Sequence, residues 1–236
     1  MTEFLKTAQE NLAFLLTCLL IFVGLVLVAW LAEKFLIKKP QRIGSAKSVA
    51  FIAVFGAIAA MLMFLEFPLF FAPFFYEIDF SEIPVLICTF YLGPVAGVVC
   101  EFVKILLKLL LKGTSTAFVG DFANFVVACS LVLPASIIYH SKKTKKNAII
   151  GMAVGTLVMT VFGSMFNAIY LLPKFAQLYG MPLEAIIAIG TEINPNIISV
   201  STLVLFAVVP FNLLKGIIVS FVTLLLYKRV EQLLKR

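Results

Sequence analysis

The chain has 236 residues, of which 62% are hydrophobic and only 13% are charged. Soluble domains carry roughly 45–50% apolar and about 25% charged residues, so a water-soluble globule, a disordered chain and a coiled coil are excluded as descriptions of the whole sequence. The apolar runs are long and continuous rather than alternating, which favours membrane-spanning helices over a membrane β-barrel. We therefore expect an all-α integral membrane protein in contact with the lipid bilayer.

The positive net charge of +7 is concentrated in short segments beside apolar runs. Three clusters hold most of it: Lys34, Lys38, Lys39, Arg42 and Lys47; Lys142, Lys143, Lys145 and Lys146; Lys228, Arg229, Lys235 and Arg236. Basic residues that flank membrane spans set orientation by the positive-inside rule, so we interpret them as topology signals and expect no nucleic-acid binding. They predict a multi-pass protein of the cell membrane, with the N-terminus outside and the C-terminus in the cytoplasm.

The apolar runs predict seven helices in chain order. They are 12–33, 46–65, 83–112, 120–140, 148–172 and 199–227, and 83–112 counts as two. That run is too long for one span and is broken at Gly93-Pro94, which predicts a tight turn between a short inward helix and an outward one. We expect the helix from 148 to stop at Pro173, and a short interfacial helix near 182–190.

The first run is too long for the apolar part of a signal peptide, and positive charges follow it rather than precede it. We therefore predict that residues 1–44 form an extra transmembrane helix with a basic linker, ahead of a membrane domain over 45–236. No charged residue interrupts the apolar stretch, so we expect this helix to serve insertion and orientation rather than ligand binding.

The second run carries a stripe of small residues spaced alternately four and three apart, which places them on one helix face. The stripe consists of Ala46, Ala50, Ala53, Ala57 and Ala60. Small residues allow helix backbones to approach closely within a bilayer. The stripe therefore predicts either a docking face for another membrane protein or packing against helices of the same chain.

The segment 64–80 is rich in aromatic residues. They are Phe64, Phe67, Phe70, Phe71, Phe74, Phe75, Tyr76 and Phe80. Rings of this kind form aromatic belts at membrane surfaces. They also cover planar ligands by stacking and edge packing, and the sequence leaves both interpretations open.

Polar residues inside apolar helices are costly unless they face a cavity or a partner. Asn212 and Lys215 are three apart, share one helix face and have no partner nearby in the sequence. Other polar residues fall within predicted helices or near their ends: Glu101, Lys104, Lys108, Lys112, Asp121, Asn124, Asn167 and Tyr170. We expect a polar cavity that opens outward beneath the aromatic segment.

No catalytic set is apparent, and Cys18, Cys88, Cys100 and Cys129 do not have the spacing of metal ligands. Asp79 and Glu82 alone would make a poor metal site. The sequence therefore favours a binding or transport protein without a permanently bound cofactor. A membrane-embedded enzyme or a stand-alone channel is the weaker alternative.

Four blocks of this sequence, 78–104, 121–139, 166–173 and 209–229, resemble the riboflavin-specific substrate-binding (S) components of energy-coupling factor (ECF) transporters. The resemblance implies a six-helix S-component bundle, here with one extra N-terminal helix, and an outward-facing site for riboflavin. It also implies that the alanine stripe docks on a transmembrane T component and that two ATPase subunits drive uptake. Candidate ligand-binding residues are Asn212, Lys215, Asn124, Asn167, Tyr76, Asp79, Phe80 and Lys104.

The chain departs from the family pattern in two places. Residues 1–44 add a span, and Ile105 stands where the family often has an asparagine after the lysine at Lys104. The additional cations Lys108 and Lys112 would suit a phosphate, so flavin mononucleotide or another vitamin is the alternative ligand.

Overall fold

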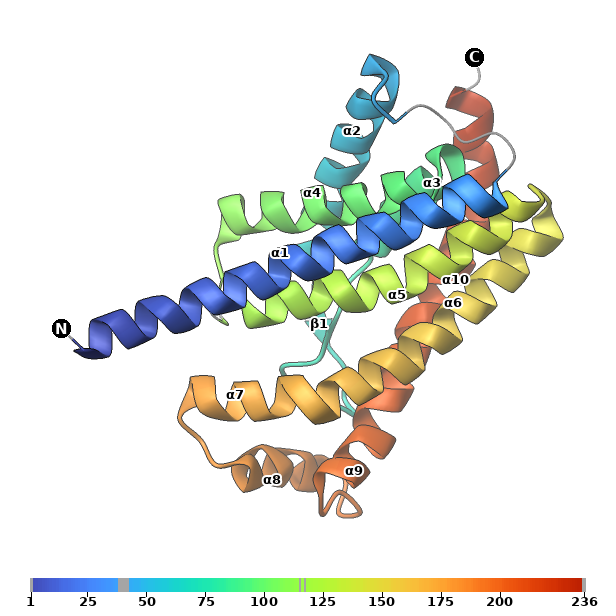
Figure 1. Cartoon of the computed structure of the whole chain (residues 1–236). Helices are drawn as coiled ribbons and strands as arrows, with labels where there is room; N and C mark the ends of the chain where they lie inside the picture. Colours follow the sequence, from blue (N-terminus) through green and yellow to red (C-terminus); the bar gives the residue numbers. More distant parts are fainter. Residues whose placement is uncertain (1, 38–42, 115, 117, 235–236) are drawn as a thin grey trace.

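The computed structural model describes residues 2–37, 43–114, 116 and 118–234 as an almost wholly helical chain (Figure 1). Lys38, Lys39, Arg42, Lys235 and Arg236 of the basic clusters lie outside the described residues. The elements are α1 Thr2–Leu36, α2 Ala46–Met63, β1 Phe67–Pro68, β2 Glu77–Ile78, α3 Glu82–Leu92, α4 Pro94–Lys112, α5 Val119–Ser141, α6 Lys145–Phe166, the π-helix η1 Asn167–Leu171, α7 Leu172–Tyr179, α8 Leu183–Ile193, α9 Val200–Leu203, the π-helix η2 Val204–Val208 and α10 Val209–Leu234.

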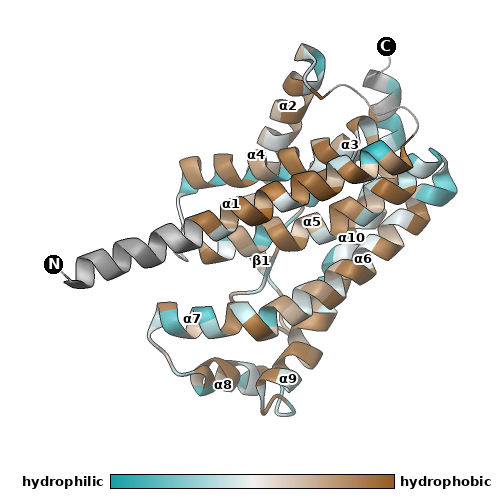
Figure 2. Cartoon of the chain, viewed as in Figure 1, coloured by the Kyte–Doolittle hydropathy of each residue, from teal (hydrophilic) through white to brown (hydrophobic). Residues whose placement is uncertain are grey.

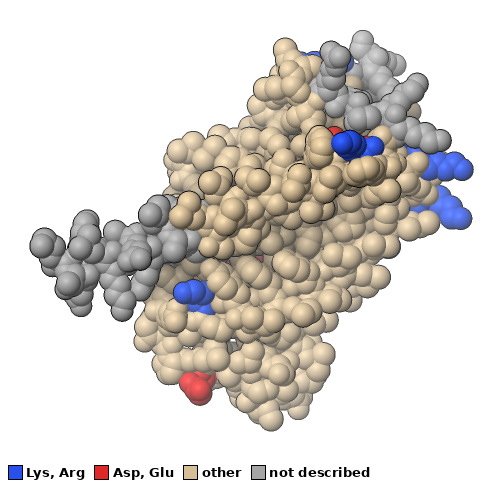
Figure 3. Space-filling model, viewed as in Figure 1, with Lys and Arg blue, Asp and Glu red and all other residues tan. Residues whose placement is uncertain are grey.

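Five helical stretches among the described residues are long and apolar enough to cross a membrane. They are Leu16–Leu36, Ala46–Met63, Val119–Ser141, Lys145–Tyr179 and Val200–Val230. Hydrophilic residues gather mainly towards helix ends and connecting turns (Figure 2), and most of the basic side chains visible in Figure 3 lie where α1 and α5 finish. We call this the basic end of the bundle. The all-α membrane fold is confirmed.

The predicted break at Gly93-Pro94 is confirmed as the turn between α3 and α4. Gly93 has a φ of 125°, a conformation that residues with a side chain rarely adopt. Its amide donates to the carbonyl of Thr89 at 2.8 Å, and the Thr89 hydroxyl donates back to the carbonyl of Gly93 at 2.9 Å. These two bonds close α3 before Pro94 opens α4.

The prediction that the helix from 148 stops at Pro173 is wrong. The helix runs on through η1 and α7 to Tyr179. Pro173 comes directly after the π-helical turn η1, where the backbone hydrogen-bond register changes, so the helix continues despite the missing N–H. The predicted interfacial helix near 182–190 is present as α8. The π-helical turns η1 and η2 both lie near the end of the bundle opposite the basic end.

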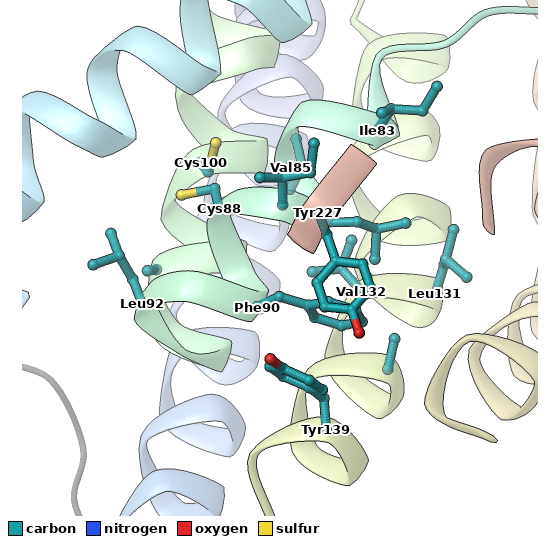
Figure 4. Close-up of a cluster of buried hydrophobic side chains, with 14 of the residues drawn as sticks. Ile83, Val85, Cys88, Phe90, Leu92, Cys100, Leu131, Val132, Tyr139 and Tyr227 are labelled. Carbon is teal, nitrogen blue, oxygen red and sulfur yellow. The ribbon is translucent and has the colours of Figure 1, made fainter. Parts of the chain in front are cut away.

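The largest buried cluster holds α3, α5 and α10 together near the basic end. Phe90 stacks on Tyr139 with ring centroids 4.4 Å apart, and the ring of Tyr227 meets Phe90 edge-on at 5.6 Å (Figure 4). Aromatic pairs in these geometries add to the stabilisation from burial alone. The short helix α3 is thereby fixed within the bundle.

The extra helix α1 lies along α4 and α5 (Figure 1), so it is part of the bundle rather than a detached anchor. Ala29 is fully buried in this contact, and Phe22 packs against Phe102 with ring centroids 4.5 Å apart. The opposite face of α1 exposes Leu20 and Leu27, as expected for a surface that meets lipid. The chain is thus a six-helix bundle with one additional helix.

Close contact between α5 and α6 depends on glycines. A Cβ added at Gly155 would lie 2.5 Å from the carbonyl oxygen of Leu131, which is backbone and cannot move aside. We predict that Gly155→Ala destabilises the fold by about 1–3 kcal/mol through overpacking. Gly24→Ala is the matched control, because nothing lies within 4 Å of its added Cβ. Thermal unfolding in detergent should show a lower Tm for Gly155→Ala alone; equal Tm values would contradict the packing described here.

Candidate functional site

A cavity of about 490 Å³ lies in the half of the bundle away from the basic end. It is lined by the early turns of α5 and α10, far from the basic residues that follow α5 and end α10. Its polar lining consists of Glu66, Tyr76, Glu77, Asp79, Glu82, Lys108, Lys112, Thr114, Thr116, Asp121, Asn124, Asn167, Tyr179, Asn212 and Lys215. The volume falls within the range of small-molecule sites, about 300–1,000 Å³.

Buried ion pairs form the floor of the cavity. The Nζ of Lys215 lies 2.9 Å from Asp79 Oδ2 and 3.2 Å from Glu82 Oε1. The Nζ of Lys104 lies 2.7 Å from Glu101 Oε2 and 3.5 Å from the same Oε1 of Glu82. Glu82 therefore links the two lysines, and the network joins α3, α4, α10 and the segment before α3.

Two neutral groups complete the coordination of Lys104. Its ammonium donates to the hydroxyl of Ser81 at 3.2 Å and to Asn124 Oδ1 at 3.1 Å. Both lysines are thus held by several partners, as buried charges require.

Asp79 lies outside the helices, between β2 and α3. Burial alone would raise the pKa of its carboxyl, but Lys215, Lys104 and a hydrogen bond from Ser81 lower it to about 2. Asp79 is therefore ionised at neutral pH. Its charge keeps Lys215 in place beside the cavity.

The aromatic segment folds over the cavity and is attached to its wall. The Tyr76 hydroxyl donates to Asn167 Oδ1 at 2.8 Å, and its ring packs against Phe211 at 5.6 Å. Phe74 and Phe75 line the cavity, whereas Phe70 is 91% exposed at the tip of the segment. Some rings of the segment therefore border the cavity, whereas others face outward.

Three polar atoms around the cavity are buried and have no hydrogen-bond partner within the described part of the chain. They are the amide nitrogen Nδ2 of Asn212 and the carboxylate oxygens Oε2 of Glu82 and Oδ2 of Asp121. A buried polar group left unpaired is costly, so such atoms are available to a ligand. The site can offer one amide donor and two carboxylate acceptors.

The additional cations at the mouth are both paired. Lys108 lies 2.5 Å from Asp121 Oδ1 and donates to the carbonyl of Gly113 at 3.0 Å. Lys112 forms an ion pair with Glu66. Acidic partners thus offset the positive charge of both lysines at the mouth.

Six of the eight candidate ligand residues line the cavity: Tyr76, Asp79, Asn124, Asn167, Asn212 and Lys215. Lys104 lies beneath the cavity in the ion network, and Phe80 packs partly buried against the large core cluster. Glu82 and Asp121 also line the cavity, although neither was among the eight candidates. The pairing of Asp121 with Lys108 is visible only in the fold.

Lys215 has no partner nearby in the sequence, but the fold supplies one. Asp79, which lies 136 positions earlier in the chain, accepts a hydrogen bond from it. We predict that Lys215→Met destabilises the ligand-free protein by about 3–5 kcal/mol, since two buried carboxylates lose a partner. The double variant Asp79→Asn/Lys215→Met removes one of those charges and should recover part of the loss. Thermal unfolding measures both; a Lys215→Met variant as stable as the parent would contradict this network.

Comparison with known proteins places the chain in a family. A family model described as the substrate-specific component of ECF transporters matches residues 47–227. A riboflavin transporter RibU of Staphylococcus aureus (strain TCH60) is 36% identical over 190 residues, covering 80% of this chain and 93% of that protein. A RibU of Streptococcus thermophilus (strain ATCC BAA-250 / LMG 18311) is 32% identical, covering 80% of this chain and 85% of that protein.

A solved structure of the S component of a bacterial ECF transporter is similar with a TM-score of 0.63 and 39% sequence identity. It covers 80% of this chain and 98% of the other. The curated relatives are named as transporters, which confirms the expectation that the chain is not an enzyme. The chain belongs to the substrate-specific components of ECF transporters.

Proposed function

We propose that the chain is the riboflavin-binding subunit of an ECF transporter and takes up riboflavin together with a separate T component and two ATPase subunits. The observation that carries the proposal is the unpaired amide of Asn212, buried in a cavity between aromatic rings and a polar floor. Relatives at 32–36% identity that bear the name riboflavin transporter support it.

The chemistry of riboflavin matches this lining. Its ring system is planar and has one edge with carbonyl oxygens and ring nitrogens, and its ribityl chain carries hydroxyl groups. The side-chain amide of Asn212 can donate to a carbonyl, while the free oxygens of Glu82 and Asp121 can accept from N–H or O–H groups. Rings such as Phe75 and Phe211 border the same cavity and can cover the planar system.

The pairing at the mouth favours riboflavin over flavin mononucleotide. A phosphate would have to compete with Asp121 for Lys108 and with Glu66 for Lys112. Riboflavin is neutral and leaves both ion pairs intact. A membrane enzyme or a stand-alone channel has no comparable support, since no described residues form a catalytic set in the cavity.

We place the cavity on the outer side of the membrane and the basic end in the cytoplasm, with the N-terminus outside. Basic residues flank spans on the cytoplasmic side as a rule, and here they lie away from the cavity. A ligand arriving from outside would then meet the aromatic segment first.

We predict that Asn212→Leu weakens riboflavin binding by about tenfold or more, because a ligand carbonyl loses its only amide donor from this position. Quenching of riboflavin fluorescence on titration with folded, purified protein measures the affinity. Asn196→Leu is the matched control, since Asn196 is exposed and does not line the cavity. Equal affinities for the two variants would refute this assignment of the site.

The alanine stripe on α2 supports docking on a T component. Ala46, Ala50 and Ala53 are exposed, Ala57 is half-buried and only Ala60 is buried. Close packing within the chain uses a different residue, Gly56, whose added Cβ would lie 2.6 Å from Val103. The stripe therefore remains accessible along most of its length, as a docking face requires.

We predict that Ala53→Leu leaves riboflavin affinity unchanged but abolishes uptake in cells, because the larger side chain prevents close approach of a partner helix. Ile58→Phe serves as control, because Ile58 is exposed on the same helix on a face away from the stripe. Normal uptake by a stably expressed Ala53→Leu protein would show that the stripe does not dock.

A further inference from the structure

The turn between α3 and α4 is held from three directions. Within the turn, Gly93 and Thr89 exchange hydrogen bonds, and from α5 the ring nitrogen Nε2 of His140 donates to the carbonyl of Thr89 at 2.9 Å. The third contact comes from α1. Glu33 there is only 7% exposed, and its Oε1 accepts a hydrogen bond from the backbone amide of Val95 at 3.0 Å.

Glu33 therefore caps the N-terminus of α4. The first amides of a helix lack partners within it, and a carboxylate satisfies them while also interacting favourably with the positive end of the helix dipole. Pro94 cannot supply an amide, so Val95 offers the first one. A Cβ added at residue 93 would lie 2.7 Å from Glu33 Oε1, so a side chain there would displace the carboxylate from Val95.

Between Phe22 and Glu33, α1 packs against both α4 and α5. Phe22 packs between Phe102 of α4 and Phe125 of α5, at centroid distances of 4.5 and 5.9 Å. Ala29 is fully buried one turn before Glu33. A charge buried in a membrane is costly without a partner, so an anchor alone would not place a carboxylate here.

The hairpin fixed by this turn carries the floor of the cavity. Glu82 begins α3, Lys104 lies in the middle of α4, and the two meet in the ion network. The match to the family begins at residue 47, so α1 lies outside the region it covers.

We propose that Glu33 is a positioning residue for the ligand cavity: by capping α4 it locks α1 onto the α3–α4 hairpin and holds Glu82 and Lys104 in place. The effect of Glu33 on riboflavin affinity rests on the proposed function, whereas its role in fixing the α3–α4 hairpin does not. On this proposal, α1 helps to fix the hairpin in addition to inserting and orienting the chain.

The test compares Glu33→Leu, Glu33→Gln and the control Lys34→Gln, whose position is exposed on the same helix. Two quantities are measured on purified full-length protein. The first is riboflavin affinity by fluorescence quenching. The second is the labelling rate of Cys88 and Cys100 by a membrane-permeant maleimide, resolved by mass spectrometry; both thiols are fully buried, one on α3 and one on α4.

We expect Glu33→Leu to weaken riboflavin affinity by about three- to tenfold, as loss of a helix cap does, and to speed labelling of both cysteines. Glu33→Gln should behave as the parent in both measurements, because its amide oxygen still accepts from Val95. If any substitution at this end of α1 disturbed the protein, Lys34→Gln would also change riboflavin affinity and cysteine labelling.

The proposal is overturned if Glu33→Leu matches Lys34→Gln in labelling, or if Glu33→Gln is as impaired as Glu33→Leu. Should Glu33→Leu not fold, Glu33→Asp takes its place, because its side chain is one methylene shorter. We expect Glu33→Asp to bind riboflavin more weakly, and its cysteines to be labelled faster, than in both Glu33→Gln and the parent. If the parent itself does not bind riboflavin, the proposed function fails, while the labelling rates still decide whether Glu33 holds the hairpin.

Discussion

A carboxylate shared by two buried lysines connects the parts of this protein that make a binding site. Glu82 lies between Lys104 and Lys215, with Asp79 and Glu101 completing the network. Water is not available inside a bilayer to solvate these charges, so each must find its partner within the fold. The consequence is geometric: α3, α4 and α10 can pack only in positions that keep the pairs together.

The aromatic segment depends on the same network. Asp79 follows β2 and is held by Lys215, while Tyr76 just before it is held by Asn167. These two contacts draw the segment across the cavity, and the antiparallel pair of β1 with β2 closes it into a loop. The charges of the cavity floor are thus balanced in pairs, and among the described residues around the cavity the amide of Asn212 is an unpaired donor.

Much of the helical arrangement could be predicted from the sequence, because apolar runs and the Gly93-Pro94 break are local signals. Asn212 and Lys215 stood out as well, since polar residues deep in an apolar run are rarely without a role. The pairings could not be predicted, because Lys215 and Asp79 lie 136 positions apart. Pro173 suggested a helix end that is absent, because the π-helical turn before it lets the helix continue. Glu33 was overlooked because it ends an apolar run, where charges usually reach the membrane surface.

The central claim is that the cavity beneath the aromatic segment binds riboflavin. The most direct measurement is an equilibrium titration of riboflavin fluorescence with the purified parent protein, repeated with flavin mononucleotide as competitor. We expect saturable quenching at one site with sub-micromolar affinity and weaker competition by the phosphorylated flavin, since Lys108 and Lys112 already have acidic partners. Absence of saturable quenching by folded protein, or tighter binding of the mononucleotide, would contradict it.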